Sequence, residues 1–388
     1  MSRVKVNEQS LQYFLEELIR IESVNPDLSG DGSGEREMAR YIGKYLEEMG
    51  LDVRYHDLRE KRINVVTILK GSGGGKSIML NGHMDTVGVA RMEIDPFVPE
   101  CKNGRVYGRG SLDMKGGLAA QILAVQFLVE SQIDLKGDVV LACVADEEHA
   151  SIGTEAILKE YSADAAVICE PTNLGIVISH KGFAWTRIEV FGKAAHGSLP
   201  EMGVDAITKA GKVLTEIENL GRNKLKQKRH PLLGSPSIHA SLISGGIGLS
   251  TYPDYCKIEL ERRTLPGEDK ATVSEEIQGI LRGVKSRDDQ FKAKSEVFFA
   301  RPAYEISASE PIVKSLSRAY QLIQGEESQF LGMGGWIESA LLAEAGIPTV
   351  IFGPSGEGAH ASVEYVDFDS VVRTTEILIE LIVDFCNA

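Results

Sequence analysis

The chain has 388 residues, enough for two or three domains that each bury a core. Hydrophobic residues make up 43% and charged residues 25%, which excludes a disordered, collagen-like or coiled-coil protein. The 42 Lys and Arg against 56 Asp and Glu give a net charge of −14, so nucleic acid and anionic membranes are unfavourable partners.

The cellular location is predicted from three features. Glutamates at positions 8, 16, 17 and 22 interrupt any signal-peptide hydrophobic segment. No uninterrupted apolar run reaches the ~18 residues that cross a bilayer. The five cysteines are scattered without CxxC spacing, which favours reduced thiols over disulfides or a thiolate metal site. We therefore expect a cytoplasmic protein without a transmembrane helix.

The first 180 residues predict alternating helices and strands. Apolar side chains recur at helical spacing over residues 11–19, 38–46 and 115–129. Between and after them come β-rich runs at 63–69, 77–81, 139–145 and 165–169. Apolar strands that alternate with helices are typical of an α/β layer with a mostly parallel sheet flanked by helices.

The pattern changes near residue 180. Strand-like runs at 183–190, 237–243, 256–262 and 291–299 accompany two amphipathic helices at 206–220 and 273–284. After Pro302 the first pattern resumes, with helices at 311–324 and 339–345 and a buried strand at 347–352. We therefore predict that residues 180–303 form a two-layer α/β sandwich inserted into one discontinuous domain, residues 1–179 and 304–388.

Acidic residues and histidines gather where the predicted strands end. They lie in NGHMDTV (81–87), GRGSLDMKGG (108–117), ADEEHASIGT (145–154) and CEPT (169–172), with a late histidine in GPSGEGAHASVEYV (353–366). Because ligands bind outside the carboxyl ends of strands in open α/β sheets, we expect these segments to converge. His and carboxylate ligands without Cys suit a hydrolytic metal site.

The set of segments resembles the dinuclear metallohydrolases that include acetylornithine deacetylase, succinyl-diaminopimelate desuccinylase, aminoacylase and carboxypeptidase G. The resemblance spans essentially the full length and includes GKAAHGSLP (192–200) and ERRTLPGE (261–268). It implies a zinc-exopeptidase-like catalytic domain, and a ferredoxin-like inserted domain that acts as a lid and joins two chains into a homodimer.

The resemblance also implies two divalent metal ions per chain, with zinc as the expected metal and cobalt or manganese as alternatives. Asp113 would bridge the two ions, His83 and Glu170 would complete one coordination shell, and Glu148 and His360 the other. A carboxylate can bridge with its two oxygens, and two cations that share a water lower the pKa of that water. In this family the peptide after the bridging aspartate tends to be cis.

The acid–base roles follow from the same resemblance. Glu147 would be the general base that takes a proton from the attacking water and returns it to the leaving nitrogen. We expect Glu147 and Glu148 to lie in an extended stretch, where neighbouring side chains point to opposite sides. Asp85 would accept the other ring N–H of His83. Asp146 is interpreted either as a solvated helix cap or as a functional residue.

The inserted part contributes three substrate-side candidates. His196 would cross the dimer interface and donate to the oxyanion of the tetrahedral intermediate. Arg263 would bind the substrate α-carboxylate, with Arg262 as its competitor and an ordinary surface salt bridge as the alternative role for Arg263. Ser250 stands where many relatives have a substrate-contacting Asn, and Glu338 replaces an aspartate, so the acyl and amino halves of the substrate stay open.

We therefore predict a dimeric two-metal amidohydrolase of amino-acid metabolism that removes the acyl group from an N-acyl amino acid or cleaves a small peptide-like amide. One alternative is a metallo-exopeptidase of the carboxypeptidase G or dipeptidase type. Another is a non-catalytic homologue that binds amino-acid derivatives. The presence of Glu147 and of all five ligand positions disfavours the non-catalytic alternative.

Overall fold

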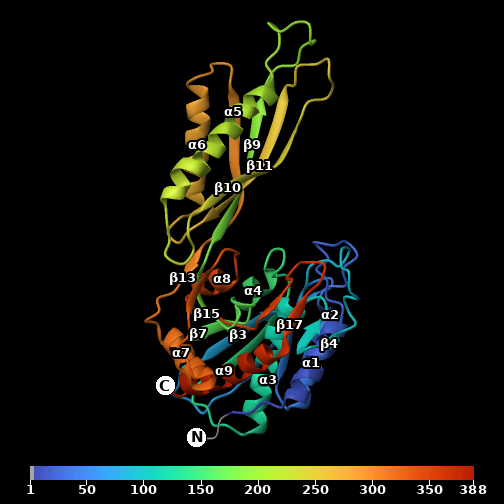
Figure 1. Cartoon of the computed structure of the whole chain (residues 1–388), viewed down its shortest axis with the longest axis vertical. Coiled ribbons are helices and arrows are strands. Elements are labelled where there is room, and N and C mark those ends of the chain that lie inside the picture. The colour runs from blue at the N-terminus through green and yellow to red at the C-terminus, as the bar shows by residue number, and fades with distance from the viewer. Residues whose placement is uncertain (1–3) are drawn as a thin grey trace. The chain divides into compact units, whose positions relative to one another are not determined.

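The computed structural model describes residues 4–388, which form two compact units (Figure 1). The first unit contains the chain up to Ile178, together with Ile306–Leu331 and Leu341–Ala388. The second contains Ser179–Glu305 and Gly332–Ala340. Both units combine sheets with helices, so the α/β class is confirmed.

The central sheet of the first unit is mixed. Its strands follow the order β1 (Val53–Arg59), β2 (Arg62–Leu69), β6 (Val139–Val144), β3 (Ile78–His83), β7 (Ala165–Ile168), β15 (Thr349–Ile351) and β8 (Ile176–His180). The last two residues of β8 are the first residues of the second unit. Only β6, β3, β7 and β15 are parallel to their neighbours in this group, and the outer pairs are antiparallel. The prediction of a mostly parallel sheet was therefore wrong at the edges. A two-residue turn joins β1 to β2, and such a short connection permits only antiparallel pairing.

Helices cover the central strands of this sheet. Every residue of β3, β6 and β7 is buried, as expected for strands covered on both faces. α3 (Gly116–Glu130) packs against α9 (Phe368–Cys386) and α1 (Glu8–Arg20), and α9 also packs against α7 (Pro311–Gln324). α2 (Arg36–Glu48) and α4 (Ile152–Ile157) contact β2.

One segment of the first unit is long and apolar enough to cross a membrane by length and composition. It is Ser111–Glu130, and 78% of the apolar window within it is buried inside the fold. Its apolar character is therefore explained by its place in the core. The five cysteines are free in the structure, and four of them are buried.

A small antiparallel sheet joins two distant parts of the first unit. Its order is β16 (Gly356–Glu357), β17 (Tyr365–Asp367), β5 (Arg105–Tyr107) and β4 (Glu100–Lys102). Val366 of β17 lies opposite Val106 of β5. This pairing brings the loop before β17 beside the turn η1 (Ser111–Lys115), which follows β5 along the chain.

The second unit is a four-stranded antiparallel sheet with two long helices. The strand order is β10 (Ser237–Gly245), β11 (Tyr255–Thr264), β9 (Gly182–Phe191) and β12 (Lys292–Arg301). Alternate residues of β9 and β11 are buried against α5 (Ala206–Asn219) and α6 (Lys270–Lys285), in a core that includes Ile188, Ile258 and Ile277. Helical turns η2 (Leu220–Lys224) and η3 (Leu225–Gln227) follow α5. The chain passes between units near β13 (Tyr304–Glu305), β14 (Phe330–Met333) and α8 (Ser339–Glu344).

Candidate active site

The predicted metal ligands all lie in the first unit, at the ends of strands or in the turns that follow them. His83 ends β3, Asp113 lies in η1, Glu147 and Glu148 follow β6, Glu170 follows β7, and His360 lies between β16 and β17. The peptide bond between Asp113 and Met114 is cis, as the resemblance implied.

Asp113 lies at the centre of this group. Its Oδ1 is 3.2 Å from Nε2 of His83, and its Oδ2 is 3.2 Å from Nε2 of His360. Glu170 Oε1 is 3.5 Å from the His83 nitrogen, and Glu148 Oε2 is 3.1 Å from the His360 nitrogen. The two oxygens of Asp113 therefore face two separate half-sites, each with one imidazole and one further carboxylate.

Glu147 belongs to the same cluster. Donor atoms of His83, Glu147 and Glu170 all lie within 4.8 Å of one another, as do those of His83, Asp113 and Glu148. The expected extended stretch at Glu147 and Glu148 is wrong, because both residues lie in a turn. The cause is Asp146, whose φ of +71° reverses the chain, and whose carbonyl accepts the Ser151 amide at 2.6 Å. Both glutamates therefore approach His83 instead of pointing to opposite sides.

The site attracts positive charge. Burial alone would lower the pKa of His83, but the hydrogen bond to Asp113 and the nearby glutamates raise it well above its usual value. The pKa of His360 is raised to about 10, first by its hydrogen bonds to Asp113 and Glu148. Burial, reinforced by the charge of Asp113, raises the pKa of Glu148 to about 7. The raised pKa values of both imidazoles reflect the negative charge around them, and this set of imidazole and carboxylate donors suits a two-metal centre.

Asp85 supports the site differently from our expectation. Nδ1 of His83 lies 2.9 Å from the backbone carbonyl oxygen of Asp85, whereas the nearer carboxylate oxygen is 3.7 Å away. The carboxylate instead accepts the backbone amides of Glu147 at 3.1 Å and Glu148 at 3.2 Å. Because these amides already occupy both of its oxygens, the carboxylate holds the turn and the carbonyl fixes the imidazole.

Two buried charged residues that sequence reasoning missed hold Asp113 in place. Glu364 accepts the amides of Gly110, Leu112 and Asp113 at 3.0, 3.0 and 3.1 Å. Arg109 donates to Glu364 at 2.6 Å and to the carbonyl of Ala361, beside His360, at 3.0 Å. The only signal in the sequence was a glutamate within the otherwise apolar run around position 364.

The substrate-side candidates lie in the second unit. His196 and Ser250 are exposed and come from adjacent loops, where the Gly197 amide donates to the Ser250 carbonyl at 2.8 Å. Nε of Arg263 donates to Glu261 at 2.7 Å, and its side chain is 30% exposed. Arg262 is fully buried and paired internally with glutamates, which removes it as the competitor for a substrate carboxylate.

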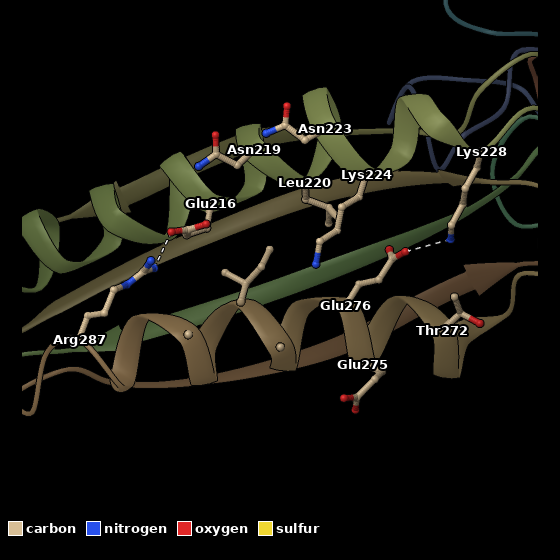
Figure 2. Close-up of a pocket in the computed structure, with 13 residues that line it drawn as sticks. Glu216, Asn219, Leu220, Asn223, Lys224, Lys228, Thr272, Glu275, Glu276 and Arg287 are labelled. Carbon is tan, nitrogen blue, oxygen red and sulfur yellow. Dashed lines mark hydrogen bonds and ion pairs between the residues drawn. The ribbon is translucent and has the colours of Figure 1, made fainter.

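A cavity of about 630 Å³ in the second unit contains none of the predicted site residues. It lies between α5 and α6, and Figure 2 shows ion pairs from Arg287 to Glu216 and from Lys228 to Glu276 across it.

Glu338, the other departure from the family pattern, is buried. It is only 2% exposed, just before α8 begins.

Comparisons with known proteins agree with this arrangement. The family model of "Peptidase family M20/M25/M40" matches residues 79–384. The N-formyl-4-amino-5-aminomethyl-2-methylpyrimidine deformylase of Bacillus subtilis is 30% identical, over 89% of this chain and 88% of that protein. The acetylornithine deacetylase of Proteus mirabilis is also 30% identical, over 93% of each chain.

Solved structures show the same fold. The aminopeptidase PepT of Bacillus cereus superposes with a TM-score of 0.82 at 22% identity, covering 98% of this chain and 99% of that chain. A tripeptidase of Staphylococcus aureus superposes with a TM-score of 0.82 at 24% identity, covering 99% of this chain and all of that one. With a family model that covers most of its length, the chain belongs to peptidase family M20/M25/M40 and is a metal-dependent hydrolase of amide bonds.

Proposed function

We propose that this hydrolase removes a small acyl group from the nitrogen of an amino acid or a related amine, at a centre of two divalent ions. The observation that carries the proposal is the geometry of Asp113, whose two oxygens each lie 3.2 Å from a different imidazole. In our assignment Asp113 is the bridging ligand. His83 and Glu170 belong to one ion, and Glu148 and His360 to the other.

Zinc is the metal that we propose, with cobalt and manganese as alternatives. Imidazole nitrogens and carboxylate oxygens without thiolates are suitable ligands for each of these ions. When bound, two such ions lower the pKa of a shared water and polarise the carbonyl group of the amide. The chain's own contribution is to hold the ligands, through Asp85, Glu364 and Arg109.

Glu147 is our candidate for the proton shuttle. Its carboxylate lies within 4.8 Å of donor atoms of His83 and Glu170, so it would face a water held between the ligands. The glutamate would accept the proton of the attacking water and pass it to the leaving nitrogen, which must be protonated before it departs. A general base of this kind typically contributes about 10²- to 10⁴-fold to the rate.

The relatives favour a deacylase over an exopeptidase. The two 30%-identical relatives are a deformylase and a deacetylase, both of which remove a small acyl group from nitrogen. The similar peptidases are less than 25% identical and support the fold alone. We propose that Arg263 binds the carboxylate of an amino-acid substrate through its terminal nitrogens. Ser250 lies beside the His196 loop, at the end of β10 and β11 remote from Arg263, and we propose that its hydroxyl contributes to the site that His196 serves. The non-catalytic alternative is set aside by membership of a hydrolase family.

We also propose that residues 180–303 form a ferredoxin-like inserted domain that acts as a lid and joins two chains in a homodimer. Edge strand β10 supports the dimer, because Leu242 and Ile243 are 63% and 54% exposed on it. Ile247, just beyond the strand, is 88% exposed. An edge strand with exposed apolar side chains is suited to pairing with another chain. In such a dimer His196 would serve the site of the neighbouring copy. A cytoplasmic location and a role in amino-acid metabolism belong to the same proposal.

Metal removal and a substrate panel test the function. Metal-free protein should regain activity when zinc, cobalt or manganese is restored, with two ions bound per chain by elemental analysis. N-formyl, N-acetyl and N-succinyl amino acids should then be hydrolysed with higher kcat/KM than dipeptides. Faster turnover of dipeptides would replace the deacylase by the exopeptidase, and a saturating content of one ion per chain would overturn the two-metal centre.

A further inference from the structure

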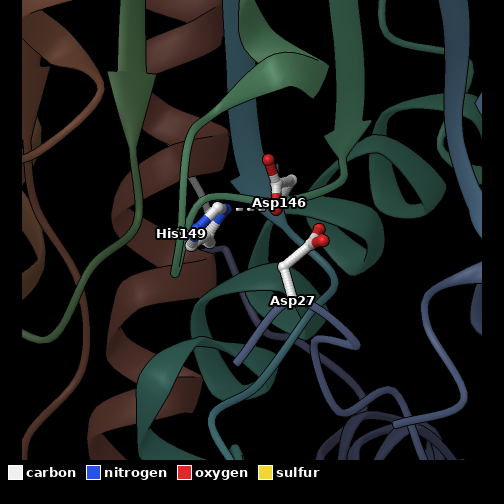
Figure 3. Close-up of side chains that lie close together, drawn as sticks. All are labelled: Asp27, Asp146 and His149. Carbon is white, nitrogen blue, oxygen red and sulfur yellow. Dashed lines mark ion pairs between the residues drawn. The ribbon is translucent and has the colours of Figure 1, made fainter. Parts of the chain in front are cut away.

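A second cluster of acidic residues and a histidine includes the two residues that flank Glu147 and Glu148 in the sequence. Donor atoms of Asp27, Asp146 and His149 lie within 4.8 Å of one another, and Figure 3 shows the three side chains together. The arrangement looks like a third metal site. Nη2 of Arg62, however, already lies 2.7 Å from Asp27 and 2.8 Å from Asp146, so a guanidinium supplies the positive charge there.

Arg62 is an unusual residue to find in the interior. It begins β2, and its side chain is fully buried. Besides Asp27 and Asp146, it contacts Glu35 and the side-chain oxygen of Asn25. A buried guanidinium surrounded by acceptors fixes the position and orientation of each of them. One consequence is that the side-chain amide of Asn25 can point in only one direction, with its oxygen toward Arg62 and its nitrogen away.

The nitrogen of Asn25 then connects this cluster to the candidate active site. It donates to Oδ2 of Asp85 at 2.7 Å and to Oδ1 of Asp146 at 3.1 Å. Asp85 in turn accepts the backbone amides of Glu147 and Glu148. Both donor hydrogens of Asn25 are therefore used between two buried carboxylates that would otherwise repel each other.

We propose that Asn25 is a positioning residue for the hydrolytic reaction, held by Arg62 and acting through Asp85 on the turn that carries Glu147 and Glu148. The inference rests on the proposed roles of these two glutamates. Asp85 accepts the backbone amides of the turn, and Asp146 is the residue at which the turn begins. Asn25 keeps the two carboxylates at a fixed separation, so the glutamates keep their positions relative to His83.

Asn25→Asp is the sharpest test, because it keeps the size of the side chain and replaces the donor by an acceptor. Mutation of residues that hydrogen-bond to metal ligands typically lowers metal affinity or activity by about 10- to 100-fold. We expect losses in that range in the affinity for divalent ions, measured by chelator competition with zinc, and in kcat at saturating metal, with KM within about twofold of wild type. Asn25→Ala introduces no charge and should show the same pattern, so it decides the question if Asn25→Asp does not fold.

Leu381→Ala is the matched control for loss of stability. Leu381 is buried in α9 and carries no polar atom, so its truncation should lower the melting temperature while metal affinity and kcat stay within about twofold of wild type. Asn25 variants that melt earlier but keep wild-type metal affinity and kcat would overturn the inference and leave the proposed function standing. Wild-type protein that binds fewer than two ions would overturn both.

Discussion

Glu364 accepts a hydrogen bond from the backbone amide of Asp113 at 3.1 Å, across 251 positions of the sequence. The same carboxylate accepts the amides of Gly110 and Leu112, so one buried side chain fixes the backbone over the first half of η1. Arg109 offsets its negative charge at 2.6 Å. The orientation of the central carboxylate therefore depends on a residue from the far end of the chain.

Glu364→Gln should weaken metal binding. The substitution keeps the shape of the side chain, but it replaces an oxygen that accepts backbone N–H groups by an NH₂ group that cannot accept them. The turn at Asp113 loses at least one of its hydrogen bonds and the ion pair with Arg109. We expect the affinity for zinc to fall by about 10- to 100-fold, as measured by chelator competition.

Glu357 provides the control for this substitution. It is an exposed glutamate of β16, in the same small sheet, where it pairs with Tyr365 of β17. Glu357→Gln should bind zinc like wild type. Equal losses of zinc affinity in the two variants would mean that the total charge near the sheet controls metal binding. The hydrogen bonds from the backbone around Asp113 to Glu364 would then have no specific effect.

Glu147 and Glu148 should respond differently to removal. Glu147→Ala deletes the proposed proton shuttle but no proposed ligand, so kcat should fall by about 10²- to 10⁴-fold while metal content and KM stay near wild type. Glu148→Ala deletes a proposed ligand of the ion near His360. Its metal content at a fixed low zinc concentration should fall toward one ion per chain.

Elemental analysis after gel filtration, paired with steady-state kinetics, separates the two roles. A Glu147→Ala protein that loses an ion, together with a Glu148→Ala protein that keeps both, would exchange the assignments. The comparison is needed because both carboxylates lie in the cluster: Glu147 groups with Glu170, and Glu148 groups with Asp113.

The sequence predicted those features that depend on the types of the side chains. Histidines and carboxylates at strand ends predicted the cluster around Asp113, and the structure brings all of these side chains together. Apolar runs predicted β2, β3, β6 and β7 because strands buried on both faces must be apolar throughout.

Long-range hydrogen bonds to the backbone could not be predicted in this way. The donors to Glu364 are backbone N–H groups, which every residue except proline has, so no pattern of side chains predicts them. The same holds for the hydrogen bonds that the amides of Glu147 and Glu148 donate to Asp85. The turn at those glutamates was also mispredicted, because Asp146 adopts a left-handed conformation with a φ of +71°, which the residue types around it did not indicate.

The stability of the second unit should depend on pH through His180. Burial lowers the pKa of this histidine to about 4, and its ring bonds to the Lys181 carbonyl and to the Ser339 hydroxyl as a neutral group. An unfolded histidine has a pKa of about 6.5, so the unfolded chain takes up the proton first as the pH falls. The stabilisation is complete above pH ~6.5 and is lost down to pH ~4, by at most about 3 kcal/mol.

Urea unfolding followed by tryptophan fluorescence measures this effect, because both tryptophans, Trp185 and Trp336, lie in the second unit. His180→Gln should be less stable than wild type at pH 7 but should lose less stability between pH 7 and pH 4.5. His239→Gln, at an exposed position on β10, is the matched control. Parallel pH profiles for wild type and His180→Gln would contradict the prediction.

His196 should act in the neighbouring chain of the proposed dimer. It is exposed on a loop of the second unit, whereas every predicted metal ligand lies in the first. Neither His196→Ala nor Glu147→Ala homodimers should be active, because every site lacks one group. In a mixed dimer, the chain with intact Glu147 receives an intact His196 from its partner. One site of two is then complete.

Subunit exchange between the two inactive variants therefore tests the arrangement directly. Random exchange makes about half of all dimers mixed, and each has one working site of two, so activity should recover to roughly a quarter of wild type if sites act independently. Mass-tagged chains report the extent of exchange. If His196 served its own chain, a mixed dimer would hold one site without the histidine and one without the glutamate, so exchange without recovery would place His196 outside the neighbouring site.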